Sequence, residues 1–140
     1  MKEKVYQLCD VVECNHAYIH CKADGDEWSV KANADRLQEI YEYANRLRIE
    51  YTTMANTLYP EYQRRREEVN KEKIYTPEEI EEKRDWRKYG IGADTDLQYH
   101  NEQVRERKWQ VSGFYDALDW AWNQRDKYGK LAQQAKGGLR

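Results

Sequence analysis

Residues 33–58, NADRLQEIYEYANRLRIEYTTMANTL, decide the fold that we expect for this chain. The apolar residues of this stretch recur at alternating intervals of three and four positions, which places them along one face of an α-helix. This first apolar stripe consists of Leu37, Ile40, Ala44, Leu47, Tyr51, Met54 and Leu58. A helix with one apolar face needs a packing partner, so the rest of the chain must supply a second such surface.

Polar and breaking residues mark both ends of this helix. Asn33 can accept a hydrogen bond from a free amide in the first turn, and Asp35 adds negative charge at the positive end of the helix dipole. Pro60 removes a backbone donor and disfavours a helical conformation at Tyr59, so we expect the helix to cover residues 33–58. The highly charged residues 59–76 then form a bend or a projecting arm.

A second stripe with the same spacing predicts the packing partner. It consists of Leu97, Asn101, Val104, Lys108, Val111, Tyr115, Leu118 and Trp122. We therefore expect a second long helix over residues 95–128, capped by Asp94 or Thr95 and packed antiparallel to the first. Its two polar members, Asn101 and Lys108, would fix the register of the pair or contact a partner. The tail, residues 129–140, is expected to be loose.

The connection between the long helices carries the clearest local signal of the sequence. In Thr76-Pro77-Glu78-Glu79, the threonine can cap the amide of Glu79 and the glutamate can reach back to the amide of Thr76. Pro77 stands at the first helical position, where no donor is missed. This capping box predicts a short helix over residues 77–89, ended by Gly90-Ile91-Gly92.

The N-terminal residues 4–32 have the alternation of β-strands. Residues 5–12 are rich in apolar residues, apolar and polar residues alternate over 17–22 and 27–32, and the turn sequence Asp24-Gly25-Asp26 separates the last two segments. This pattern predicts an antiparallel hairpin or meander of two to three strands. The fold class is accordingly α+β, with a small N-terminal sheet followed by a mainly helical region, all within one domain of 140 residues.

The composition favours neither a membrane nor a polyanion as a general partner. The net charge is −2, 36% of the residues are charged, and the mean hydropathy is −1.20. No run of eighteen apolar residues and no signal peptide occurs, so we expect a soluble cytoplasmic protein without a membrane partner. Three cysteines, an odd number confined to the N-terminal region, favour reduced thiols over disulfides.

Five potential metal ligands occur close together near the N-terminus: Cys9, Cys14, His16, His20 and Cys21. Four of them could build a tetrahedral zinc site, but paired Cys-x-x-Cys motifs are missing. We therefore favour small buried thiols in strands and expect no metal or cofactor. A cysteine nucleophile paired with His20 or His100 has no third orienting residue in the sequence, so an enzyme is the least favoured class.

A basic triplet, Arg64-Arg65-Arg66, stands beside Tyr62 and is the local nucleic-acid signal of the chain. Glu67 and Glu68 follow directly and neutralise much of its charge. Because non-specific nucleic-acid binding needs several phosphate contacts, a solvated helix face is the favoured interpretation and nucleic-acid binding the alternative.

Aromatic residues are more abundant than a small core requires, with five Trp and twelve Tyr. Trp, Tyr and Arg are enriched at binding hot spots, so the rings that the stripes leave over are candidates for binding. The candidate binding residues are Tyr62, Arg64, Arg65, Arg66, Trp86, Trp109, Trp120 and Trp122.

These observations predict a non-enzymatic binding protein that covers a surface of another macromolecule. Another protein or protein complex is the partner that we expect first, and the size and composition suit a small bacterial or phage-encoded accessory or inhibitor protein. Nucleic-acid binding through the Arg and Tyr residues is one alternative. A structural homo-oligomer, with the first apolar stripe paired between chains, is another.

Overall fold

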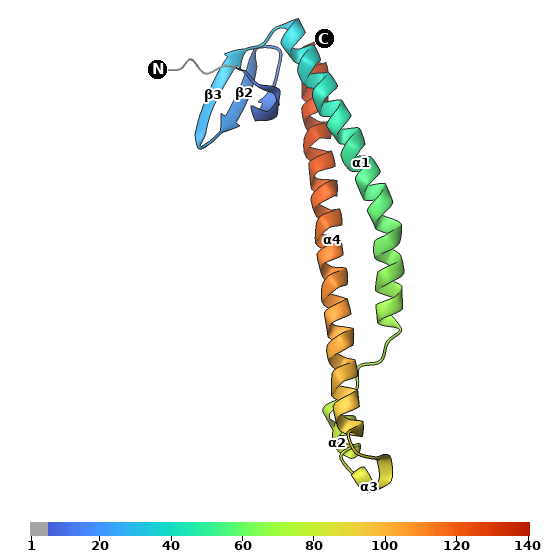
Figure 1. The fold of residues 1–140 in the computed structure, drawn as a ribbon. Coiled ribbons are helices and arrows are strands. Elements are labelled where there is room, and N and C mark those ends of the chain that lie inside the picture. The colour runs from blue at the N-terminus through green and yellow to red at the C-terminus, as the bar shows by residue number, and fades with distance from the viewer. Residues whose placement is uncertain (1–5) are drawn as a thin grey trace. The chain divides into compact units, whose positions relative to one another are not determined.

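The computed structural model describes residues 6–140 and has the expected class, a three-stranded antiparallel sheet followed by helices (Figure 1). A 3-10 turn and the sheet come first, and the helices follow. In chain order the elements are η1 (Leu8–Asp10), β1 (Val11–Cys14), β2 (Tyr18–Ala23), β3 (Asp26–Lys31), α1 (Ala34–Asn70), α2 (Pro77–Glu82), α3 (Trp86–Tyr89) and α4 (Ala93–Gly138).

The sheet is the predicted meander, with strand order β1-β2-β3. Ile19 lies opposite Val30 on β2 and β3, and the two-residue turn Asp24-Gly25 has positive φ at both positions. The first strand is shorter than predicted over residues 5–12, because residues 8–10 form η1 and pairing begins at Val11. Lys4 and Val5, which the prediction included, lie outside the described residues.

Two compact units make up the chain: residues Met1–Ala55 with Trp120–Arg140, and residues Asn56–Asp119. We call them unit 1 and unit 2. Within each unit α1 and α4 pack side by side and antiparallel, as the two stripes predicted. In unit 1 Tyr43 contacts Tyr128 and Tyr51 contacts Trp120, and in unit 2 Tyr62 contacts Tyr115. The prediction that the chain folds as one domain stays a prediction.

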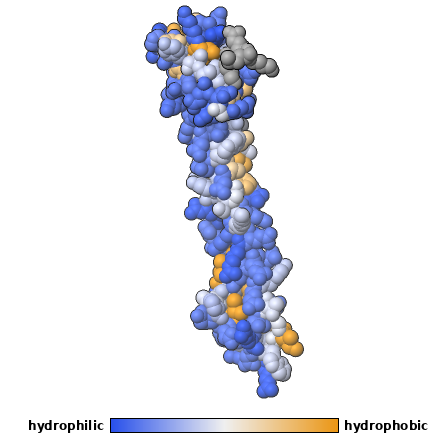
Figure 2. Space-filling view, turned by 90° about the vertical axis from the view of Figure 1, so that its left-hand side faces the viewer, coloured by the Kyte–Doolittle hydropathy of each residue, from blue (hydrophilic) through white to orange (hydrophobic). Residues whose placement is uncertain are grey.

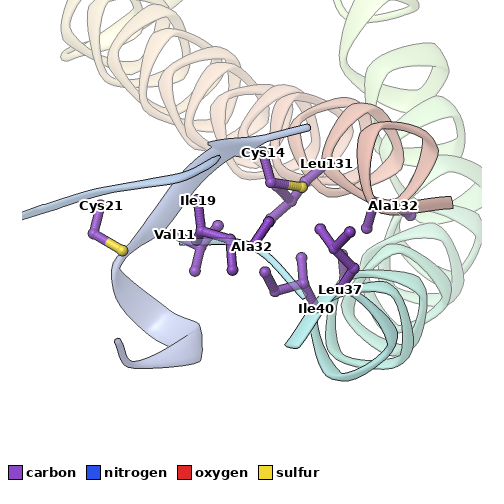
Figure 3. Close-up of a cluster of buried hydrophobic side chains, with 11 residues drawn as sticks. Val11, Cys14, Ile19, Cys21, Ala32, Leu37, Ile40, Leu131 and Ala132 are labelled. Atoms are coloured by element: carbon purple, nitrogen blue, oxygen red, sulfur yellow. The ribbon is translucent and has the colours of Figure 1, made fainter. Parts of the chain in front are cut away.

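The main hydrophobic core belongs to unit 1, where one face of the sheet meets both long helices (Figure 3). Apolar side chains alternate along the strands, so Ile19 and Cys21 of β2 point to the same side and are fully buried. The first turns of α1 and the last turns of α4 cover that side. The buried members of this core are Val11, Cys14, Ile19, Cys21, Ala32, Leu37, Ile40, Ala44, Leu131, Ala132 and Ala135.

The start of α1 agrees with the sequence, but its end does not. The side chain of Asn33 accepts a hydrogen bond from the backbone N–H of Arg36 at 2.8 Å, which confirms the predicted cap. The helix then continues through Pro60 to Asn70, so the predicted end at residue 58 and the arm over 59–70 are wrong. Ion pairs four residues apart and the burial of Val69 stabilise the helix beyond the proline.

The buried side of α1 also differs from the predicted stripe near residue 54. Met54 of the predicted stripe is 42% exposed, whereas the neighbouring Ala55 is 2% exposed. A 3.6-residue helix drifts relative to a strict alternation of three and four, so a small residue takes the buried position.

Replacing Pro60 with alanine should stabilise unit 2. Alanine restores the missing N–H donor and removes the ring from the helix interior, which is expected to raise the free energy of unfolding by about 1–3 kcal/mol. Urea unfolding followed by circular dichroism measures this change. Glu67→Ala, an exposed change on the same helix, serves as the control, with an effect below about 0.5 kcal/mol. An unchanged or lowered midpoint for Pro60→Ala would show that the proline is accommodated without cost.

The connection from α1 to α4 contains two short helices in place of the one predicted over residues 77–89. Both halves of the Thr76–Glu79 capping box are present at the start of α2, as predicted. The chain leaves the helix after Glu82, and Asp85 starts α3 by accepting a hydrogen bond from the N–H of Arg87 at 3.2 Å. Gly90 ends α3 with a φ of 91°, which a side chain would strain.

Both ends of α4 differ from the prediction. The helix begins at Ala93, because the carbonyl of Gly92 accepts the first hydrogen bond, from Asp96, so neither Asp94 nor Thr95 is the cap. At the other end the helix runs to Gly138, and the predicted loose tail over residues 129–140 is wrong. Leu131, Ala132 and Ala135 repeat the helical spacing and are buried against the sheet and α1.

The described helices are strongly polar. None of them combines the length and the apolar composition that a membrane span needs. The face seen in Figure 2 is largely hydrophilic, with small separate hydrophobic areas. This face therefore does not present a large continuous apolar surface to a partner.

Candidate binding site

The candidate binding residues belong to different units. Tyr62, the arginine triplet, Trp86 and Trp109 are in unit 2, whereas Trp120 and Trp122 are in unit 1. Trp120 packs edge-on against Tyr51, with ring centroids 5.3 Å apart, and Tyr51 stacks on Tyr128. Burial raises the pKa of Tyr128. Trp120 is thus half exposed but part of an aromatic cluster that joins α1 to α4 within unit 1.

The arginine triplet divides between two sides of the helix pair of unit 2. Arg64 forms ion pairs with Glu61 and, at 2.9 Å, with Glu68. Arg65 pairs with Glu61 at 2.9 Å and lies over the ring of Phe114 at 5.1 Å. Hydrogen bonds from Arg64 and Arg65 lower the pKa of Glu61 to about 2. The charges of these two arginines are therefore compensated at neutral pH.

Arg66 points to the other side, where a cavity opens between α1 and α4. We call it the Tyr62–Tyr115 cavity; its volume is about 280 Å³. Eight residues line it: Tyr62, Arg66, Val69 and Asn70 from α1, and Lys108, Val111, Ser112 and Tyr115 from α4. On each helix these residues recur at intervals of three or four positions, so each helix lines the cavity with one of its faces.

The cavity has an uncompensated positive charge. Neither Arg66 nor Lys108 forms an ion pair with any residue in the described range 6–140, and no carboxylate lines the cavity. Two nearby cations contrast with them, since Arg107 pairs with Glu72 and Arg65 with Glu61. An anion is the group that this site attracts.

Aromatic rings and small polar groups complete the cavity. The rings of Tyr62 and Tyr115 contact each other at 5.5 Å with an interplanar angle of 48°, and the valines add apolar surface. Asn70 and Ser112 supply an amide and a hydroxyl. The arrangement can therefore hold an anionic group beside a flat or apolar group, and none of the lining residues is a cysteine or histidine that would serve as a nucleophile or base.

Trp109 and Trp86 are the other candidate rings of unit 2, and both are exposed. Trp109 is 63% exposed and lies three residues before Ser112, one helical turn from the cavity. Trp86 belongs to α3 and lines a hollow of about 300 Å³ with Arg84, Gly90, Ile91, Gly92 and Asp94. Ile91 in that hollow is 92% exposed, and we did not predict it as a site residue, because an isolated isoleucine between glycines carries no periodic signal.

The candidate zinc ligands do not form a site. Cys14 and Cys21 face the core of unit 1 and Cys9 is exposed. Among the described residues no three His, Cys, Asp or Glu side chains gather as metal ligands would. Burial raises the pKa of Cys14 to about 11 and also raises that of Cys21, so both thiols stay protonated at neutral pH. Cys21 is therefore the small buried thiol in a strand that was predicted, whereas the same prediction for Cys9 is wrong, because η1 replaces the strand there and leaves Cys9 exposed.

A polar contact that the sequence pattern did not predict lies on the open face of the sheet. The imidazole Nδ1 of His20 lies 3.3 Å from Ser29 Oγ, and Nε2 lies 3.9 Å from Glu27. His20 and Ser29 are direct cross-strand partners on β2 and β3, and Glu27 also pairs with Lys22 at 3.5 Å. The register of the hairpin accounts for this row of polar side chains.

Comparisons with protein-family models, with curated proteins and with solved structures find no match to this chain.

Proposed function

We propose that this chain is a non-enzymatic binding protein that contacts another macromolecule through the Tyr62–Tyr115 cavity and the surface beside it. One observation carries the proposal: Arg66 and Lys108 line a cavity without an ion-pair partner among the described residues, whereas Arg64, Arg65 and Arg107 are all paired. An unpaired cation is free to form a charge-assisted hydrogen bond with an incoming group.

The surroundings of the two cations support binding. Tyr and Trp side chains bury much surface at little cost in conformational entropy, which is why they recur at hot spots. Tyr62 and Tyr115 are already in contact, and Trp109 is exposed one turn away. Two helices that pack along their length hold these groups in place before a partner arrives.

A protein partner remains the first expectation from composition, in keeping with a small cytoplasmic accessory or inhibitor protein of a bacterium or a phage. The unpaired cations narrow this expectation to partners that present an anionic group. Catalysis has less support, because the cavity lining holds no histidine, cysteine or carboxylate that would activate Ser112 or Lys108.

Co-purification with matched variants tests the proposal. Arg66→Gln with Lys108→Gln removes two unpaired cations, and Arg64→Gln with Arg65→Gln removes two paired ones, so both double variants change the net charge equally. Tagged wild-type protein is expected to retain a stable macromolecular partner from lysate, tested with and without nuclease treatment. The Arg64/Arg65 variant should retain it as well, whereas the Arg66/Lys108 variant should lose at least about 90% of it.

Mass spectrometry identifies the retained partner, and circular dichroism shows that each variant is folded. Retention by the Arg66/Lys108 variant would contradict the role of the cavity. Absence of any partner at every salt concentration, with the protein alone sedimenting as a larger assembly, would favour the homo-oligomer.

A further inference from the structure

The Tyr62–Tyr115 cavity brings charge and rings together from two helices. Arg66 comes from α1 and Lys108 from α4, so an anion in the cavity can be contacted by both cations. Tyr62 and Tyr115 come from the same two helices and are in contact with each other. A ligand that fills this cavity of about 280 Å³ therefore needs an anionic group and a flat ring close together in one small chemical group.

A nucleotide with an unstacked base meets both requirements. Its phosphate is the anion that arginine and lysine bind, and its base can stack on tyrosine rings. Asn70 and Ser112 also line the cavity and can hydrogen-bond to a base edge or a sugar hydroxyl. An acidic side chain of a protein would use the two cations but leave the rings without a partner.

Double-stranded nucleic acid fits less well. Its bases are stacked on one another, so the tyrosine rings would gain nothing, and affinity would depend on many phosphate contacts. The chain has a net charge of −2, and Arg64, Arg65 and Arg107 near the cavity are paired with carboxylates. Affinity must therefore come from stacking as well as from charge, which single strands alone permit.

Two further side chains of α4 lie one helical turn before residues that line the cavity. Arg105 precedes Lys108 by three residues and Trp109 precedes Ser112 by three, which places a cation and an exposed ring beside the cavity on the helix surface. Glu106 and Asp116 stand on the same helix near Trp109 and limit the positive surface. The positive surface is accordingly short, so few phosphates can be contacted at once.

We infer that the Tyr62–Tyr115 cavity binds one nucleotide of a single-stranded nucleic acid, with the phosphate between Arg66 and Lys108 and the base against the tyrosine rings. Trp109 stacks with the adjacent base. This inference rests on the proposed function, because it names the class of macromolecule that the cavity recognises.

Fluorescence anisotropy with labelled oligothymidine and oligouridine of about 15 nucleotides tests the inference. The wild-type chain is expected to bind with a dissociation constant on the order of 10 µM at low salt. Two phosphate contacts predict a loss of affinity of roughly 25-fold when salt rises tenfold. A duplex of equal length should bind at least about tenfold more weakly.

The two double variants separate the cavity from general attraction. Arg66→Gln with Lys108→Gln should weaken binding at least about tenfold and flatten the salt dependence, whereas Arg64→Gln with Arg65→Gln should change it less than about twofold. Tyr62→Leu and Tyr115→Leu, checked for folding by circular dichroism, should weaken binding without changing the salt slope. Quenching of Trp109 fluorescence, compared with a Trp109→Leu variant, reports the adjacent base.

Three results would overturn the inference: no binding at low salt, equal losses in both double variants, or a duplex bound as tightly as the single strand. A fourth is displacement of the oligonucleotide by an equal concentration of oligoglutamate peptide, which would assign the cavity to an acidic protein segment. A different result separates the two proposals. If the chain does not bind the oligonucleotide but retains a partner from nuclease-treated lysate, and the Arg66/Lys108 variant loses that partner, the proposed function is supported and the nucleotide assignment is wrong.

Discussion

Ending the chain after Gly129 is expected to unfold unit 1. The deletion removes Leu131, Ala132 and Ala135 from the core beneath the sheet, and Gln134, whose side chain accepts a hydrogen bond from the N–H of Cys14 at 3.1 Å. A buried leucine alone contributes about 2–4 kcal/mol, and the two alanines and the hydrogen bond bring the expected loss to about 4 kcal/mol or more. Because small domains have only about 5–15 kcal/mol of net stability, the sheet should lose its fixed packing.

Near-ultraviolet circular dichroism and urea unfolding measure this loss. Ending the chain after Gly138 is the matched control, since it removes only the exposed Leu139 and Arg140, and it should change stability by less than about 0.5 kcal/mol. The point variant Leu131→Ala should lie between the two, at about 2–4 kcal/mol. Equal midpoints for the truncation after Gly129 and the control would show that the last helical turns are dispensable.

Asn101→Leu is expected to be the most damaging single change in unit 2. Asn101 is 3% exposed, and its side chain accepts a hydrogen bond from the N–H of Tyr75 at 2.8 Å and donates one to the carbonyl of Tyr75 at 2.9 Å. Leucine would leave both backbone groups without these partners, at an expected cost of about 2–4 kcal/mol.

Urea unfolding of full-length Asn101→Leu, compared with Gln98→Leu, measures the cost. Gln98 is an exposed residue of the same helix, so its change should cost less than about 0.5 kcal/mol. His100, whose Nε2 lies 2.7 Å from the carbonyl of Lys73, is untouched in both. Stability of Asn101→Leu equal to that of the wild type would mean that the connection before α2 does not depend on this side chain.

The sequence predicted the features that depend on short stretches. The two apolar stripes identify α1 and α4 as an antiparallel pair, because helical spacing is visible within a few turns. The cap at Asn33 and the capping box at Thr76 and Glu79 are also present as predicted, since each involves residues three apart in the chain. Asn101 is an unusual polar member of the second stripe. Its backbone partner, Tyr75, is 26 residues away, and no local sequence pattern predicts that contact.

The misplaced helix ends have one physical cause. Local signals at Pro60 and at residues 129–140 favour ending a helix, but burial of Val69 beyond the first and of Leu131 within the second favours continuing it. Tertiary packing contributes more free energy than the propensity of one proline or a few glycines costs. The sequence alone does not state which surface will be opposite these residues.

The candidate site, like the helix ends, was predicted from the sequence only in part. By itself the sequence determined the fold class, the pairing of the long helices and the presence of the arginine triplet beside Tyr62. Only the tertiary structure decided that Arg64 and Arg65 are paired with glutamates while Arg66 joins Lys108 and Tyr115 at a cavity. The reason is that helical spacing sets the direction in which each side chain points, whereas its partner across the cavity comes from a helix some forty residues later in the chain.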